Sequence, residues 1–118
     1  MSSVFQLVGG AADPIGVKLT STNATVIAQA VSGNARVSVP WVRFTALDST
    51  LPTLGIYIEK TDGTKVYTRP ASKAMGDKES LLFDEGYVLL PGWKLYAIAG
   101  TADKIDVTGL ALLGDGNA

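Results

Sequence analysis

The chain has 118 residues, 47% hydrophobic and 18% charged, with a formal net charge of −1 and neither cysteine nor histidine. This length predicts a single domain that buries its core without disulfides, and the balanced charge leaves no electrostatic footprint for nucleic acid or an anionic membrane surface. Without cysteine and histidine the chain cannot form Ser-His-Asp or Cys-His nucleophile systems, nor zinc sites of thiolates and imidazoles. Catalysis would therefore have to rest on carboxylates, Lys or Tyr.

The chain begins with a short apolar segment, residues 4–8, which ends in two glycines. This segment has no basic flank and is too short for the hydrophobic part of a secretory signal, so we expect the protein to stay in the compartment where it is made. Residues 11–15, which include Pro14, are predicted to be a flexible connector. Residues 1–16 are therefore predicted to be either an N-terminal arm or the first strand, and both alternatives are open.

Two strands are predicted next. Val17 and Leu19 begin one apolar run and residues 26–31 form a second with three β-branched residues, and residues 21–23 between them are Ser, Thr and Asn. These polar side chains favour a turn because they can bond to nearby backbone groups. The pattern predicts a hairpin formed by the two strands.

Apolar and polar residues alternate over residues 36–44, but the phase slips after Trp41. Such a slip predicts a β-bulge or a crossing between sheets. Pro40 has no N–H to donate, which favours an edge or bulged position. Residues 54–59 alternate again, with Tyr57 on the polar side, and predict a half-buried strand.

The clearest local signal is Asp62-Gly63, which is typical of a type I′ turn because both residue types accept positive φ values. It predicts a tight hairpin between residues 54–60 and 65–69. Asp62 and Gly63 are therefore assigned to turn geometry rather than to chemistry. After the hairpin there is no sustained helical stripe, and at most a single helical turn fits around residues 72–75.

Three short strands separated by two turns are predicted between residues 86 and 113, and Pro91 with Gly92 forms the first of these turns. A meander of this kind cannot bury its own apolar face, so it must pack against the strands upstream. The strands predicted in the second half of the chain are residues 81–83, 87–90, 93–99 and 105–113.

Together these segments predict an all-β fold, an antiparallel and jelly-roll-like β-sandwich of about eight strands separated by regular turn signals. The sandwich is expected over residues 17–113, and residues 114–118 are expected to form a flexible tail. No internal repeat of fixed period is present.

Carboxylates are the first candidates for acid–base or metal chemistry. Asp84 and Glu85 are adjacent, and neighbours on an extended chain project to opposite faces, so they cannot readily act on one bond. Asp103 and Asp106 straddle a turn, but calcium prefers six to eight oxygen ligands, which this run does not supply. We therefore predict no catalytic residue, no metal site and no cofactor.

Aromatic side chains are the candidates for binding. Exposed Trp and Tyr side chains can stack on sugar rings or on another subunit, because each combines a large apolar area with a polar tip. Trp93 follows the Pro-Gly turn at an expected end of the sandwich. We expect it to be the aromatic residue most exposed to solvent, although core or rim packing is favoured for any single aromatic side chain.

Two C-terminal segments carry a family resemblance. Residues 89–95, LLPGWKL, and residues 99–110, AGTADKIDVTGL, are similar to the end of accessory virion proteins of tailed bacteriophages. In that group a late strand, a Pro/Ala-Gly turn, an apolar strand, an Ala-rich turn and a Val-Thr-Gly strand recur at the end of a small sandwich. The group includes capsid decoration, minor capsid and neck- or tail-associated proteins.

The resemblance implies a non-enzymatic particle component, most simply a capsid decoration or minor capsid protein that stabilises neighbouring subunits. It implies a virion protein made in the host cytoplasm that forms a dimer or trimer and contacts a major capsid or other virion protein. The balanced charge predicts that the protein binds neither nucleic acid nor membrane. The expected subunit interface consists of the leading apolar side chains Phe5, Leu7 and Val8, together with Trp93.

Two other functional classes remain open. A carbohydrate- or receptor-binding module of a phage tail would present exposed Trp and Tyr on one sandwich face. An enzyme is the weakest alternative, because it would have to use carboxylates such as Glu85 or Asp103.

Overall fold

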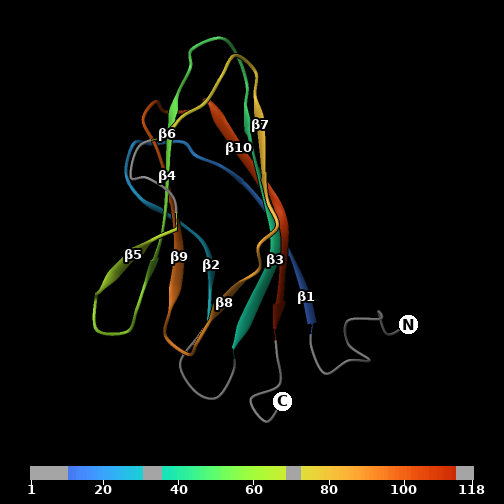
Figure 1. The fold of residues 1–118 in the computed structure, drawn as a ribbon, viewed down its shortest axis with the longest axis vertical. Helices are drawn as coiled ribbons and strands as arrows, with labels where there is room; N and C mark the ends of the chain where they lie inside the picture. The colour runs from blue at the N-terminus through green and yellow to red at the C-terminus, as the bar shows by residue number, and fades with distance from the viewer. Residues whose placement is uncertain (1–10, 31–35, 69–72, 114–118) are drawn as a thin grey trace.

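The computed structural model describes residues 11–30, 36–68 and 73–113, which form ten β-strands in two facing antiparallel sheets (Figure 1). The predicted apolar segment at residues 4–8 and the predicted tail at residues 114–118 lie outside the described residues. The strands are β1 Ala11–Lys18, β2 Thr25–Gln29, β3 Val37–Ala46, β4 Thr53–Glu59, β5 Lys65–Tyr67, β6 Lys73–Ala74, β7 Ser80–Phe83, β8 Tyr87–Leu89, β9 Lys94–Ala99 and β10 Ile105–Leu113.

The strand order confirms the predicted antiparallel sandwich. The first sheet has the order β1-β10-β3-β7, and the second has the order β2-β9-β4-β5. Strand β8 also pairs with β3, on the side where β7 lies, and β6 also pairs with β4, on the side where β5 lies. Each of these two positions is therefore one interrupted strand, so the ten strands fill eight positions in a jelly-roll-like order.

Two predicted strand pairings are wrong because, in each, strands that follow one another in the chain lie in different sheets. β1 pairs with β10 and β2 with β9, so the hairpin predicted before residue 31 does not form. β8 and β10 belong to the first sheet and β9 to the second, so the last three strands are not a meander. Each of these strands must bury its apolar face against the opposite sheet. A chain that crosses between the two sheets buries that face as well as a meander would.

β1 replaces the connector that was predicted over residues 11–15. The strand runs antiparallel to β10, from Ala11 opposite Leu113 to Lys18 opposite Asp106. Within the described residues its other side has no partner strand, which is where a strand tolerates Pro14. Residues 73–74 likewise form a short strand on β4, so the helical turn that was considered around residues 72–75 is wrong where the structure describes it.

β3 carries the bulge that the sequence predicted. Trp41 lies opposite Leu110 and Ser38 lies opposite Leu112, so Val39 and Pro40 together face a single residue of β10. β7 ends and β8 begins beside the same stretch of β3. Pro40, which has no N–H, therefore lies where the strand pairing is interrupted on both sides.

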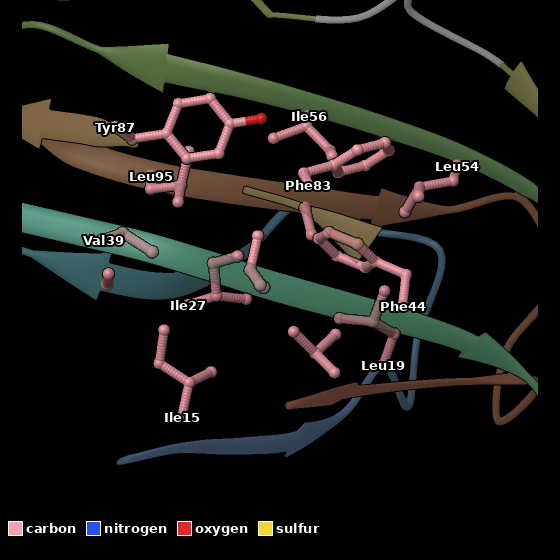
Figure 2. Close-up of a cluster of buried hydrophobic side chains, with 14 of the residues drawn as sticks. Ile15, Leu19, Ile27, Val39, Phe44, Leu54, Ile56, Phe83, Tyr87 and Leu95 are labelled. Carbon is pink, nitrogen blue, oxygen red and sulfur yellow. The ribbon is translucent and has the colours of Figure 1, made fainter. Parts of the chain in front are cut away.

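The core fills the space between the two sheets. Phe44 on β3 is fully buried and lies 5.6 Å from Phe83 on β7, measured between ring centroids. Among the described residues no polar or charged residue is buried. The described part contains no helix suited to cross a membrane. Figure 2 shows the core side chains gathered between the strands, among them Ile15, Leu19, Ile27, Val39, Phe44, Leu54, Ile56, Phe83, Tyr87 and Leu95.

Candidate functional site: one end and the two outer faces of the sandwich

The two turns predicted from the sequence meet at one end of the sandwich. The Thr61 hydroxyl, in the β4–β5 turn, donates a hydrogen bond to the carbonyl of Pro91 in the β8–β9 turn, at 3.2 Å. The same hydroxyl covers Gly92, whose φ is +88°, so closely that a Cβ there would lie 2.5 Å from Oγ1. Gly92 also donates its N–H to the carbonyl of Ala30 at 2.7 Å. The contact therefore joins loops that are far apart in sequence.

The Asp62-Gly63 turn forms the predicted hairpin but is not of type I′. Gly63 has a φ of +90°, whereas Asp62 is not among the described residues with positive φ. The Gly63 N–H bonds to the carbonyl of Lys60 at 2.9 Å, and the Lys60 N–H bonds to the carbonyl of Thr64 at 2.8 Å. This is a three-residue loop with a type I turn followed by a left-handed glycine. The Asp62 carboxylate accepts the Thr64 N–H at 2.9 Å, and this bond lowers the pKa of Asp62.

Trp93 is half-buried beside these turns rather than fully exposed. Its ring packs against the core, and the Lys60 ammonium lies 5.3 Å from the ring centroid. Trp41, at 36% exposed, and Tyr67, at 46%, are more open to solvent, so the expectation that Trp93 is the most exposed aromatic residue is wrong. The other predicted interface residues, Phe5, Leu7 and Val8, lie outside the described residues, and the interface itself stays a prediction.

Three tyrosines form a row across the outer face of the second sheet, called here the tyrosine row: Tyr57 on β4, Tyr67 on β5 and Tyr96 on β9. The Tyr57 ring stacks on Tyr96 at a centroid distance of 4.9 Å and an interplanar angle of 15°, and lies 5.2 Å from Tyr67. The Lys65 ammonium lies 5.4 Å from the Tyr57 ring centroid. These neighbours leave Tyr57 only 4% exposed although it faces outward, and this burial raises the pKa of its hydroxyl.

The outer face of the first sheet carries an apolar patch that sequence reasoning missed. Trp41, Leu82 and Val88 are exposed there, and Leu110 and Leu112 are half-buried. These five side chains, called here the Trp41 face, come from β3, β7, β8 and β10. Leu110 lies opposite Trp41, while Leu112 and Val88 both lie opposite Ser38. When the extra residue of the bulge is counted, the alternation of apolar and polar residues along β3 places Trp41 on this outer face.

The predicted carboxylates are not gathered into one site. Asp84 and Glu85 lie in the exposed loop between β7 and β8. Asp106 forms a 2.8 Å ion pair with Lys18 on β1, and Asp103 occupies a left-handed turn position with φ of +63°. Within the described ranges, no three acidic side chains come together as a metal ion would require.

Asp48 forms a polar contact that the sequence did not predict. The Lys104 ammonium, from the β9–β10 loop, donates to its carboxylate at 2.7 Å, and the backbone N–H and hydroxyl of Thr50 donate as well. The Lys104 bond first, and those of Thr50 next, hold the pKa of Asp48 well below its usual range. Because the contact ties two loops together at a partly exposed position, we assign it to stability rather than to chemistry.

Comparison with known proteins gives similarity at the level of the fold. No protein-family model matches the chain, and no curated protein matches it. A pentameric capsid protein isolated from metagenomic phage sequences is similar, with a TM-score of 0.51, 18% identity, and coverage of 85% of this chain and 59% of that protein. A structure of infectious bursal disease virus, Gx strain, gives a TM-score of 0.51 and 14% identity over 91% of this chain and 33% of that one.

A third similar structure comes from disulfide-linked pili that form Bacillus endospore appendages, with a TM-score of 0.54 and 7% identity over 90% of this chain and 88% of that one. The chain thus has a sandwich fold that also occurs in a phage capsid protein, in a structure of infectious bursal disease virus and in pili. It spans only 59% of the length of the phage capsid protein.

Proposed function

We propose that this protein is a non-enzymatic structural component of a phage particle, most simply a capsid decoration or minor capsid protein. In this role it forms homo-oligomers, docks on a major capsid or other virion protein, and stabilises neighbouring subunits. The observation that carries the proposal is the Trp41 face, because exposed apolar side chains gathered on one outer face of a sheet mark a surface that is covered by a partner. The shared fold of the phage capsid protein supports it.

Subunits of this protein cannot be joined to one another by disulfide bonds. The similar pilus structure is described as disulfide-linked, whereas this chain contains no cysteine. Cohesion between subunits must therefore come from apolar burial and polar complementarity. Phe5, Leu7, Val8 and Trp93 are the proposed interface side chains, and the Trp41 face extends that set.

Particles that lack the protein provide the test. We expect purified protein to bind saturably to particles from phage in which its gene is deleted, and to restore their resistance to heat. Trp41→Ser should abolish both effects, whereas the matched change Tyr67→Ser, on the opposite outer face, should leave them intact. Particles that neither bind the intact protein nor change in stability would exclude the role.

A carbohydrate- or receptor-binding module of a phage tail is the second candidate, and the tyrosine row favours it. Tyr67 exposes nearly half of its surface at the edge of the second sheet, and an exposed aromatic ring can stack on a sugar. Glu59 and Lys94 occupy the next outward positions on β4 and β9, where they can hydrogen-bond to hydroxyl groups. Binding on a glycan array that is lost in Tyr67→Ala and retained in Val88→Ala would support this candidate over the first.

A further inference from the structure

The Trp41 face is large enough to receive a short extended segment. It spans three neighbouring strand positions, from Leu112 on β10 across β3 to Val88 on β8, which is about 10 Å at a strand spacing of roughly 4.8 Å. Along the strands it extends from the pair Leu112–Ser38 to the pair Arg43–Leu82, about 13 Å at roughly 3.3 Å per residue.

The chain itself supplies a segment of matching size and chemistry. Residues 4–8 read Val-Phe-Gln-Leu-Val, and five extended residues span about 17 Å, close to the diagonal of the Trp41 face. The described chain begins at Ala11, opposite Leu113, and the next pair joins Ala12 to Leu112. Residues 1–10 therefore join the first sheet at the end where Leu112 and Val88 lie, with Gly9 and Gly10 between the apolar segment and β1.

The pattern of the segment favours a second copy of the chain over the same copy. In an extended conformation successive side chains point to opposite sides, so a docked extended segment would direct Phe5 and Leu7 one way and Val4 and Val8 the other. A segment folded back on its own sheet would bury one side and leave two valines in water. A segment that lies between the outer faces of two copies would bury Phe5 and Leu7 against one copy and Val4 and Val8 against the other, which removes more apolar surface from water.

We propose that residues 4–8 of one copy dock on the Trp41 face of a second copy, with Phe5 and Leu7 packed against Trp41, Leu110 and Val88. The inference rests on the proposed homo-oligomeric function and names the surface that receives the leading segment. It also accounts for an apolar patch on the outer side of a sheet whose inner side is already fully packed.

Because the chain has no cysteine, disulfide crosslinking can test this contact without background. A Leu7→Cys chain is mixed with a Val88→Cys chain of distinguishable mass, and the products are separated after mild oxidation. We expect the mixed dimer to form in much higher yield than in the control mixture of Leu7→Cys with Tyr67→Cys. Tyr67 is exposed to nearly the same extent as Val88, at 46% against 48%, but lies on the opposite outer face. Adding Trp41→Ser to the Val88→Cys chain should lower the yield to the control level.

Three other crosslinking results would contradict the docking proposal, and one of them would also contradict the proposed function. A Leu7–Val88 crosslink that forms only within one chain carrying both cysteines would overturn docking on a second copy. Equal yields in the test and control mixtures, with an intact chain that still sediments as an oligomer, would overturn the receiving surface and leave the proposed function standing. An intact chain that sediments as a monomer at every concentration, and gives no mixed dimer, would remove both.

Discussion

Replacing Gly92 with alanine should destabilise the protein more than the same replacement at Gly86. Both glycines have left-handed backbones, with φ of +88° and +80°. An L-residue with a Cβ costs roughly 1–2 kcal/mol in this region. At Gly86 nothing lies within 4 Å of the added Cβ, so this backbone cost stands alone, whereas at Gly92 the Cβ would lie 2.5 Å from the Thr61 hydroxyl.

The Thr61 side chain must then rotate and give up its hydrogen bond to the carbonyl of Pro91. Losing a hydrogen bond of this kind costs about 1 kcal/mol. We therefore expect Gly92→Ala to lower the free energy of unfolding by about 2–3 kcal/mol, which is about 1 kcal/mol more than Gly86→Ala. In a domain of this size the difference corresponds to a melting temperature lower by about 4 °C.

Urea unfolding of both variants, with and without Thr61→Ala, measures this difference directly. In the Thr61→Ala background the hydroxyl is absent, so Gly92→Ala and Gly86→Ala should cost the same. The contact between the two turns would be refuted if the two glycine variants were equally destabilised in the wild-type background. It would also be refuted if the extra cost at Gly92 persisted without the hydroxyl.

Three further changes test the rest of the fold. Gly109→Ala places a Cβ 2.8 Å from the backbone oxygen of Trp41, so we expect thermal unfolding to show a loss of about 1–3 kcal/mol, and an unchanged melting temperature would contradict the close approach of β10 to β3. Leu95→Ala empties a fully buried position and should cost about 2–5 kcal/mol in urea unfolding, so a loss below that range would argue against its burial. Because the pKa of Asp48 is lowered in the folded state, its contribution to stability is present above the unfolded pKa of about 3.9 and is lost as the pH falls below that value. Asp48→Asn should therefore flatten the acid side of the stability profile, whereas Asp84→Asn in the exposed β7–β8 loop should not, and identical profiles for the two variants would count against the Lys104 contact.

Local features of the fold could be predicted from the sequence because they depend on neighbouring residues. The strands at 37–46, 53–59, 80–83 and 105–113 follow from alternation or from apolar runs bounded by turn residues. The bulge in β3 follows from a phase slip next to a proline, and the hairpin from Asp-Gly. Even there, the turn type depends on the φ of Asp62, which the residue type alone does not determine, because an aspartate fits both turns.

The pairing of strands and the candidate surfaces could not be predicted in the same way. β2 has the same local pattern whether it pairs with β1 or with β9, and only the packing of two complete layers selects β9. The Trp41 face and the tyrosine row bring together residues from four and three strands respectively, so neither is visible before the register is known. The pair formed by Asp48 and Lys104 is missed for the same reason, because 56 positions separate its partners.

Image reconstruction of intact particles of the phage that encodes the chain tests the proposed function most directly. We predict a fixed number of copies at symmetry-related positions on the shell or its neck, each with the Trp41 face covered by a neighbouring subunit. Purified infectious particles that contain no copy of the protein, or copies whose Trp41 face is open to solvent throughout, would contradict the assembly role.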